Sequence, residues 1–227
     1  SLNLTSANSI NLARFLPQSF YYYHAVGQLG LVGVPVVFAV PSGNFGNLTA
    51  GIVAWKTGLP VKRFIAATNS NDVVPAYLAS GRFEPRPSVK TIANAMDVGN
   101  PSNFARLLDL FGGSHTEMAK TIKGFATNDQ GIRESMKKIY GAYEYVTDPH
   151  GAIGFAALEQ HLKPGEIGVC LETAHPAKFH EVVEETLGTP PVLPDRLGAY
   201  LQKEKRAIFL QPDFQEFSTY LLDNFRR

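Results

Sequence analysis

Apolar stretches alternate with amphipathic ones along the chain, and this alternation is its main structural signal. Residues 34–40 form a continuous apolar run rich in β-branched side chains, and residues 61–68 and 167–172 are two further strand-like stretches. Runs of this kind are typical of parallel strands that are covered on both faces. Because helical periodicity separates the three, the pattern predicts an α/β fold with a mostly parallel sheet flanked by helices.

Capping residues and helical spacing predict where the helices lie. Pro17 interrupts the first helix, and Ser114 with Glu117 stands at capping-box spacing for another. Asp148 and Pro149 suit the N-cap and first position of a later helix. Residues 143–147 are expected to form a short strand. The ranges expected to be helical are 9–29, 47–57, 102–111, 130–141, 148–162, a stretch that begins near 176, 194–206 and 212–226.

Composition excludes several classes of protein. With 227 residues, 44% of them hydrophobic and 18% charged, the chain can build a globular core. Its formal net charge of +1 gives no electrostatic reason to expect nucleic acid or an anionic membrane as a partner, and no apolar stretch is long enough to span a bilayer. The single cysteine, Cys170, lies in an apolar run, so we expect a core thiol in a reducing, cytoplasmic setting.

The motif PSGNFGN, residues 41–47, follows the first predicted strand and precedes a helix. Gly43 and Gly46 allow backbone conformations that bring several N–H groups to one point, and the helix adds its positive end. Such an arrangement binds anions, phosphate above all, although the spacing matches neither the P-loop nor the dinucleotide-binding loop. A plain strand-to-helix turn is the alternative, and Asn44 and Asn47 on either side of Phe45 favour function.

Two other strand ends also carry polar residues, ATNSND at 67–72 and ETAHPAKF at 172–179. Ligands of α/β sheets bind beyond the carboxyl ends of the strands. We therefore expect the three junctions to converge on one crevice. Taken singly, Thr173 is as well explained as a helix cap and His175 as a hydrogen-bonded core imidazole.

Six segments together resemble threonine synthase of the type found in bacteria and fungi. They are SANSINLAR, PSGNFGNLTAG, LPVKRFIAATNSNDVVP, NAMDVGNPSNFAR, DPHGAIGF and ETAHPAKF, in this order. The resemblance implies the tryptophan synthase β-subunit-like fold, fold type II of the pyridoxal-phosphate enzymes. It also implies conversion of O-phospho-L-homoserine and water to L-threonine and phosphate, the last step of threonine biosynthesis, with pyridoxal 5'-phosphate as cofactor.

The same resemblance assigns roles to particular residues. The cofactor phosphate is expected to bind the main-chain N–H groups of Gly43, Asn44, Phe45, Gly46 and Asn47, and Thr173 to hydrogen-bond the pyridine nitrogen. The substrate phosphate is expected to bind Ser9, Asn11 and Arg14, with Asn8 as a weaker candidate; without the resemblance, Ser9 reads as a cap and Arg14 as a surface cation. Asn69 and Asp72 are expected near the ring or its entry, and His150 either faces the cofactor or is structural. No metal ligand is assigned.

One part of the family pattern has no match. A lysine in an S-F-K-D-type segment forms the Schiff base in this family, and a TSGDTG-like loop holds the substrate carboxylate; neither occurs here. We therefore assign no catalytic residue and expect an inactive C-terminal half, whose partner is the N-terminal part of the same protein. Residues 1–190 are expected to belong to the cofactor-binding catalytic domain, and 191–227 to a helical tail packed on it.

Three alternatives remain at this point. The chain could be a non-catalytic pyridoxal-phosphate-binding relative of threonine synthase. It could belong to a related β-eliminating enzyme such as threonine dehydratase, although the SANSINLAR segment argues against this because a dehydratase has no substrate phosphate to bind. A phosphate-binding α/β module that uses no pyridoxal is the third, and a lack of affinity for the cofactor would favour it.

Overall fold

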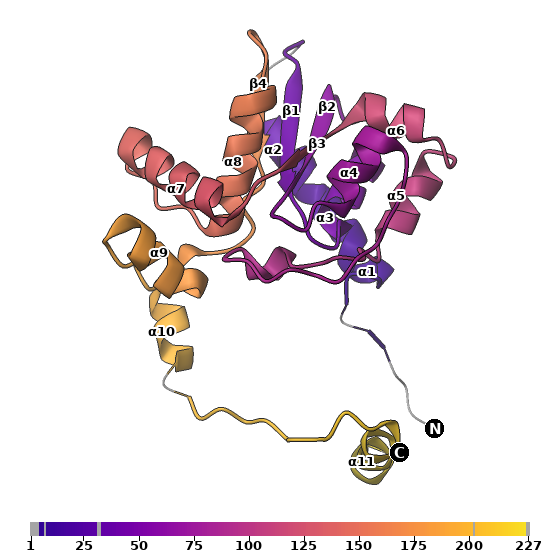
Figure 1. Cartoon of the computed structure of the whole chain (residues 1–227), viewed down its shortest axis with the longest axis vertical. Coiled ribbons are helices and arrows are strands. Elements are labelled where there is room, and N and C mark those ends of the chain that lie inside the picture. Colours follow the sequence, from indigo (N-terminus) through magenta and orange to yellow (C-terminus); the bar gives the residue numbers. More distant parts are fainter. Residues whose placement is uncertain (1–4, 7, 31–32, 202, 226–227) are drawn as a thin grey trace. The chain divides into compact units, whose positions relative to one another are not determined.

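The computed structural model describes residues 5–6, 8–30, 33–201 and 203–225. Its core is a four-stranded sheet in which all pairings are parallel and the spatial order is β3-β2-β1-β4 (Figure 1). The strands are β1 (Val36–Pro41), β2 (Arg63–Thr68), β3 (Ile122–Ala126) and β4 (Ile167–Cys170). The parallel sheet of an α/β fold is thus confirmed, and β1 is a central strand whose six residues are all buried.

Helices cover both faces of the sheet. In the body of the molecule they are α1 (Leu12–Phe15), η1 (Leu16–Gln18), α2 (Ser19–Leu29), α3 (Gly46–Lys56), α4 (Val73–Ser80), η2 (Asn94–Met96), α5 (Phe104–Leu110), α6 (His115–Thr121), α7 (Asp129–Tyr143), α8 (Pro149–His161), η3 (Pro176–Phe179) and α9 (His180–Leu187). As expected, the first helix is broken at Pro17, which is the middle residue of the short 3-10 turn between α1 and α2.

Alternate residues of β1 face two separate hydrophobic clusters. Val36, Phe38 and Val40 pack against the helices α2 to α5, where Tyr22 and Leu48 are fully buried. Val37 and Ala39 face the opposite way, toward α7, α8 and α9 (Figure 1). This alternation is what a strand with helices on both faces requires, and it leaves only the strand ends for ligand chemistry.

Local signals in the sequence explain several helix starts. Asp148 caps α8, its carboxylate accepting from the His150 N–H at 2.8 Å, and Pro149 occupies the first turn. The Ser114 hydroxyl caps α6 by accepting from the Glu117 N–H at 3.3 Å. Both starts were predicted, and they hold because a side-chain oxygen satisfies an N–H group that the helix itself cannot.

The strand predicted at 143–147 is wrong. Tyr143 still belongs to α7, and Glu144 ends that helix in the left-handed conformation with φ 53°. The fourth strand is instead β3, whose Gly124 packs so closely on α4 that an added Cβ would lie 2.8 Å from the Pro75 Cα atom. Neither β3 nor α4 was predicted.

Contacts divide the chain into two units. Residues 8–192 form the body described above. The other unit consists of residues 1–7 and 193–227, and contains α10 (Asp195–Leu201) and α11 (Phe214–Phe225). The predicted division at residue 190 into catalytic domain and tail stays a prediction.

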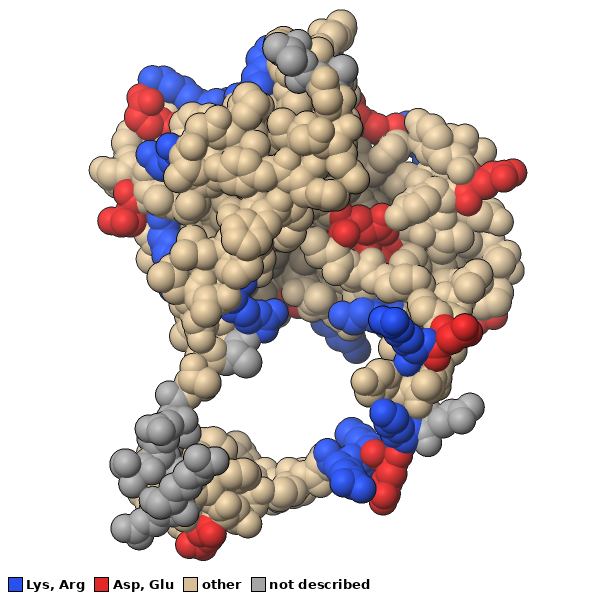
Figure 2. All heavy atoms as spheres, turned by 180° about the vertical axis from the view of Figure 1, so that it is seen from behind, with Lys and Arg blue, Asp and Glu red and all other residues tan. Residues whose placement is uncertain are grey.

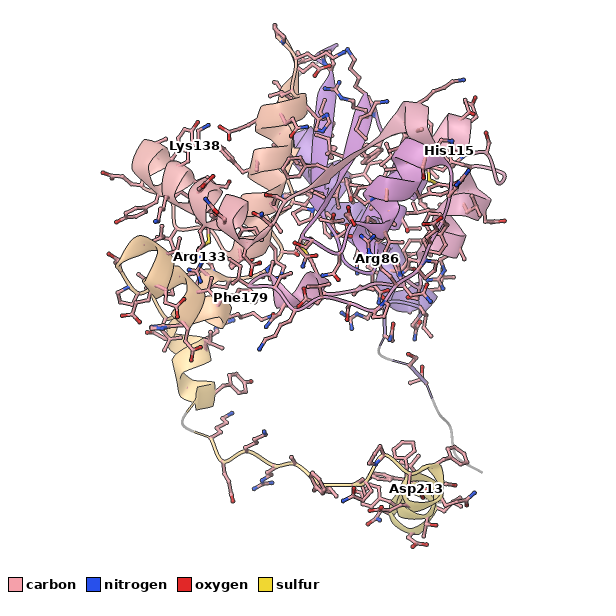
Figure 3. All side chains as sticks on the ribbon, viewed as in Figure 1. Arg86, His115, Arg133, Lys138, Phe179 and Asp213 are labelled. Carbon is pink, nitrogen blue, oxygen red and sulfur yellow. The ribbon has the colours of Figure 1, made fainter. Side chains whose placement is uncertain are left out.

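Polar contacts between helices tie α9 to the rest of the body. Arg133 of α7 lies toward α9 (Figure 3) and donates to the Thr186 hydroxyl at 2.6 Å and to the Glu185 carboxylate at 3.0 Å.

On the face shown in Figure 2, basic and acidic side chains are interspersed. Within the ranges that the structure describes, no helix has the length and apolar character needed to cross a membrane.

Candidate functional site

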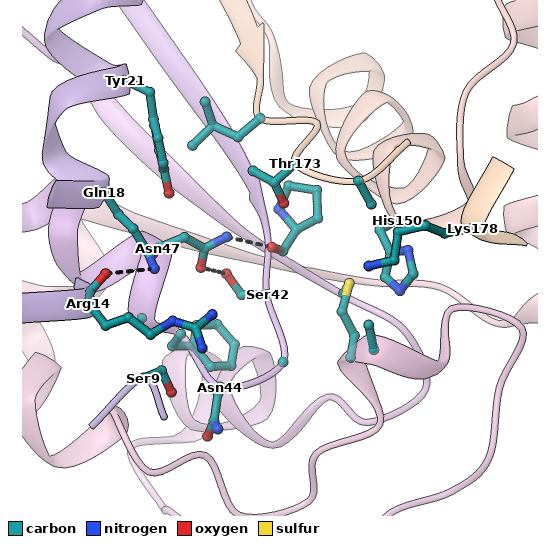
Figure 4. Close-up of a pocket in the computed structure, with 18 of the residues that line it drawn as sticks. Ser9, Arg14, Gln18, Tyr21, Ser42, Asn44, Asn47, His150, Thr173 and Lys178 are labelled. Carbon is teal, nitrogen blue, oxygen red and sulfur yellow. Dashed lines mark hydrogen bonds between the residues drawn. The ribbon is translucent and has the colours of Figure 1, made fainter. Parts of the chain in front are cut away.

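A cavity of about 400 Å³ lies beyond the carboxyl ends of β1 and β4. These two strands are neighbours, while β1 continues through α3 to β2 on its other side. The chain thus leaves β1 and β4 in opposite directions, which makes a crevice where α/β folds commonly bind ligands. The lining residues are Ser9, Arg14, Gln18, Tyr21, Pro41, Ser42, Gly43, Asn44, Phe45, Gly46, Asn47, Ala95, Met96, His150, Leu171, Thr173, Ala174, Lys178 and Phe179 (Figure 4).

Unpaired backbone N–H groups form one wall of this cavity. Among the described residues, no protein group accepts a hydrogen bond from the backbone N–H groups of residues 43–47. The loop leads directly into α3, whose amino end carries a partial positive charge. Several free donors at a helix start are suited to an anion with several oxygens, such as phosphate.

The glycines of this loop act differently from what the sequence suggested. Gly43 and Gly46 do not have positive φ; the left-handed residue is Phe45, with φ 59°. Gly43 is required for space, because an added Cβ would lie 2.7 Å from the Met96 Cα atom. Close approach of a distant backbone segment, and not conformational freedom, is therefore the reason for Gly43.

The two asparagine side chains hold the loop in place. The Asn44 Oδ1 atom accepts from the Ser102 N–H at 2.8 Å and from its hydroxyl at 3.0 Å. The Asn47 amide donates to the Pro41 carbonyl at 2.8 Å and accepts from the Ser42 hydroxyl at 2.8 Å. These bonds anchor the loop at both ends, so that Asn44 and Asn47 offer the cavity their main-chain donors.

Thr173 follows β4 and lines the same cavity as residues 43–47, as the assignment to one site requires. Just before it, the Glu172 carboxylate accepts from the Tyr145 hydroxyl at 2.6 Å, the Thr147 hydroxyl at 3.0 Å and the Asp148 N–H at 3.2 Å. The hydrogen bond to Glu172 raises the pKa of Tyr145 to about 12. This network fixes the segment that carries Thr173 against the start of α8.

The opposite side of the cavity brings together two of the three predicted substrate residues. Ser9 and Arg14 line it beside Gln18 and Tyr21 (Figure 4). The Ser9 hydroxyl accepts from the Asn103 amide at 3.3 Å, and Arg106 donates to the Ser9 and Ile10 carbonyls. Asn11 is not part of the wall; its side chain caps α1 by accepting from the Ala13 N–H at 3.0 Å.

The end of β2 does not reach the cavity, so the expected convergence of three junctions is wrong. Asn69 is fully buried and its amide donates to Thr91 at 2.8 Å and to Asp97 at 2.8 Å. Asp72 forms an ion pair with Arg86 and is not part of the lining either. Asp97 does not line the cavity, but its neighbour Met96 does and contacts the loop at Gly43.

The charges around the cavity favour an anionic ligand. Arg14 and Lys178 carry positive charge, and no Asp or Glu belongs to the described lining. Burial raises the pKa of the Tyr21 phenol well above its ordinary value, which keeps that hydroxyl protonated. No group of three or more His, Cys, Asp or Glu that could hold a metal ion occurs in the described part of the chain. The analysis of the sequence assigned no role to Gln18, Tyr21, Met96 or Lys178, although Met96 and Lys178 lie within two of the segments that carry the resemblance.

Comparison with family profiles decides the family. The profile described as pyridoxal-phosphate dependent enzyme matches residues 6–172, which is well over half of the chain. The chain belongs to this family. A second profile of the C-terminal region of threonine synthase matches residues 151–221. The family assignment makes pyridoxal phosphate the cofactor to test against the cavity, and the free donors of residues 43–47 fit its phosphate dianion.

Similar proteins narrow the resemblance to threonine synthases. The chain is 44% identical to threonine synthase of Haemophilus influenzae, over 98% of this chain and 52% of that protein. The crystal structure of threonine synthase from Escherichia coli matches with a TM-score of 0.88 and 41% identity, over 97% of this chain and 51% of that one. The structure of pyridoxal-phosphate-bound threonine synthase from Brucella melitensis gives 0.90 and 30%, over 100% of this chain and 54% of that one. The expected resemblance and fold type II are confirmed, and the chain spans about half the length of the relatives it matches.

Proposed function

We propose that the protein containing this chain is a threonine synthase, which converts O-phospho-L-homoserine and water to L-threonine and phosphate. The observation that carries the proposal is that two groups of residues suited to binding anions line one cavity. Residues 43–47 offer free N–H donors at the start of α3, and Ser9 and Arg14 lie on a second wall. A cofactor phosphate and a substrate phosphate need two such sites.

Each residue group has a definite task in this proposal. The N–H groups of Gly43, Asn44, Phe45, Gly46 and Asn47 would hold the phosphate of pyridoxal phosphate, which supplies an electron sink when bound. Thr173 would hydrogen-bond the pyridine nitrogen through its hydroxyl, a neutral partner that favours a milder sink than a carboxylate would. Ser9 and Arg14 would bind and orient the substrate phosphate.

We infer that a further segment of the same protein completes the site and supplies the lysine and the carboxylate-binding loop. Each of the first three helical elements carries an exposed apolar side chain: Leu12 of α1 is 56% exposed, Leu16 of η1 38% and Phe20 of α2 70%. A covering segment would remove this apolar surface from water. In this proposal residues 1–190 belong to the catalytic domain, 191–227 form a tail packed on it, and the protein works in the cytoplasm.

The decisive experiment measures phosphate release from O-phospho-L-homoserine. We expect no turnover by the 227-residue chain alone, and turnover once a polypeptide corresponding to the N-terminal half of threonine synthase is supplied in trans. Activity of the chain alone would contradict the assignment of the lysine to a further segment. Tight cofactor binding without any turnover in the complemented protein would favour a non-catalytic relative.

A β-eliminating enzyme such as threonine dehydratase is the second candidate, because it would use the same loop at residues 43–47. The position of Arg14 in the cavity favours the synthase, since a dehydratase substrate carries no phosphate. Release of ammonia from L-threonine or L-serine by the complemented protein, without phosphate release from phosphohomoserine, would reverse this order.

A further inference from the structure

A buried histidine in the cavity wall has one ring nitrogen without a partner. His150 is 8% exposed and lines the cavity beside Phe179, whose ring centroid lies 4.6 Å from that of the imidazole. Its Nδ1 atom lies 2.6 Å from the Asp148 Oδ1 atom. Its Nε2 atom is buried and has no hydrogen-bond partner among the described residues. His161 also has a buried Nε2 atom without a partner, but His150 is the one of the two that lines the cavity.

The hydrogen bonds around Asp148 fix which nitrogen carries the proton. Asp148 is fully buried, and its Oδ1 atom also accepts from the His150 backbone N–H at 2.8 Å. A carboxylate oxygen in this position is an acceptor, so Nδ1–H is the donor to it. In the neutral ring Nε2 is then an unprotonated acceptor, and the carboxylate behind the ring stabilises the cation that forms when Nε2 takes up a proton. A carboxylate holding a histidine in one tautomer is a recurring arrangement in acid–base sites.

The location of His150 separates it from the anion-binding walls. Figure 4 shows His150 and Lys178 on one side of the cavity, and Ser9 and Arg14 on the other, with Thr173 between them. The imidazole thus lies on the wall that Lys178 shares, away from the residue 43–47 loop and from Arg14. An unprotonated Nε2 at this wall can accept a hydrogen bond only from a proton donor.

We propose that His150 is a further catalytic residue, positioned by Asp148, whose Nε2 accepts a proton from the amino-acid substrate. This rests on the proposed function. In the step, a hydrogen–heteroatom or hydrogen–carbon bond of the substrate breaks, its electron pair stays with the substrate, and the proton forms an N–H bond at Nε2. The imidazolium is stabilised by Asp148 and returns the proton to the product or to water, so that the neutral ring is restored.

Kinetics of matched variants give the first test, with the complemented protein. His150→Gln preserves size and hydrogen-bonding capacity but cannot take up a proton, and we expect kcat to fall about 100-fold or more. The dissociation constant for pyridoxal phosphate and KM should stay within about twofold of the wild-type values. His180→Gln, at an exposed position of α9, should leave all three unchanged. A kcat within threefold of wild type, or a parallel loss of kcat and cofactor affinity, would overturn the proposal.

Nitrogen NMR of the wild-type protein tests the same residue without relying on activity or on a variant that folds. We expect His150 to carry its proton on Nδ1, and the Nε2 signal to move when pyridoxal phosphate and O-phospho-L-homoserine are added. A neutral ring protonated at Nε2, or an Nε2 signal that does not respond, would refute the role. If that signal responds but the protein releases no phosphate, the proposed function fails and the substrate contact of His150 stands. If phosphate is released and the Nε2 signal does not move, the proposed function stands and the role of His150 fails.

Discussion

Arg63 and Glu166 form a two-pronged ion pair across the amino ends of the strands. The two guanidinium nitrogens lie 2.5 Å from the two carboxylate oxygens, and the side chains are only 10% and 3% exposed. Arg63 begins β2 and Glu166 precedes β4, while β1 runs between these strands. The pair therefore joins two strands that are not neighbours in the sheet. It lies at the amino ends of the strands, and the cavity lies at their carboxyl ends.

Replacing one partner should destabilise the fold without affecting the site. Glu166→Gln leaves the Arg63 charge largely buried without its counter-ion, and we expect the free energy of unfolding to fall by about 3 kcal/mol. Chemical denaturation measures this. Glu159→Gln, which removes a more exposed ion pair with Lys138, should cost less than about 1 kcal/mol. An equal loss of unfolding free energy in the two variants would show that burying the Arg63–Glu166 pair adds nothing to stability.

The same pair should make stability depend on acid pH. Hydrogen bonds from Arg63 lower the pKa of Glu166 from 4.5 to about 2. Because the folded-state pKa lies below the unfolded one, the stabilisation is fully present above pH 4.5 and is lost as the pH falls from there toward 2. Denaturation midpoints between those limits should fall less steeply in Glu166→Gln than in wild type, and parallel curves would contradict the shift.

An added methyl group at Gly43 should weaken binding of the cofactor. The Cβ atom of Gly43→Ala would lie 2.7 Å from the Met96 Cα atom, so either the loop or the Met96 segment must move. Overpacking of this kind costs about 1–3 kcal/mol, and we expect affinity for pyridoxal phosphate to fall roughly tenfold. Gly141→Ala, at a site where a Cβ meets nothing within 4 Å, is the matched control for fluorescence titration. Unchanged affinity in Gly43→Ala would remove the steric argument.

Loss of the Arg14 charge should act on the substrate and leave cofactor binding intact. A charge-assisted hydrogen bond contributes about 1.5–3 kcal/mol, so Arg14→Gln is expected to raise KM for O-phospho-L-homoserine roughly 10- to 100-fold. Affinity for pyridoxal phosphate should not change. The exposed Arg82 does not line the cavity, and Arg82→Gln should have the wild-type KM. Equal KM values in all three proteins would place the substrate phosphate elsewhere.

Asp97 should be critical for the long connection between α4 and α5. Its carboxylate accepts from the Thr91 hydroxyl at 2.7 Å, the Thr91 N–H at 3.0 Å, and the amides of Asn69 and Asn71 at 2.8 and 3.2 Å. Asp97→Ala leaves the Thr91 N–H and hydroxyl without their acceptor and removes one acceptor from each amide, and we expect it to lower the free energy of unfolding by about 3 kcal/mol. Asp109→Ala, on the exposed face of α5, is the control, and comparable thermal midpoints for the two variants would refute this expectation.

Patterns in the sequence correctly predicted those structural features that neighbouring residues determine. The apolar run of β1, the Asp148 and Ser114 caps and the break at Pro17 were predictable because neighbouring residues determine each of them. The strand at 143–147 failed for a local reason too, since alternating aromatic and β-branched residues suggest a strand while Glu144 takes the helix-ending conformation.

What sequence reasoning missed depends on contacts between distant segments. Nothing near Gly124 shows that its strand packs on Pro75, and nothing near Gly43 shows that Met96 lies against it. The pairing of Asp148 with His150 is local, yet the position of His150 in a cavity wall becomes visible only when the cavity is assembled from five parts of the chain.

The close packing of Met96 on Gly43 limits what the glycine-rich motif can do by itself. Residues 41–47 grafted onto the end of another parallel strand would keep their composition but lose the backbone that presses on them from more than fifty positions away. Such a transplant should bind phosphate poorly unless it includes the 94–97 turn together with Asn69 and Asn71, which hold that turn through Asp97. Phosphate binding by this loop thus depends on two segments of the chain. A search for the motif alone would also find loops that lack the second segment and bind no phosphate.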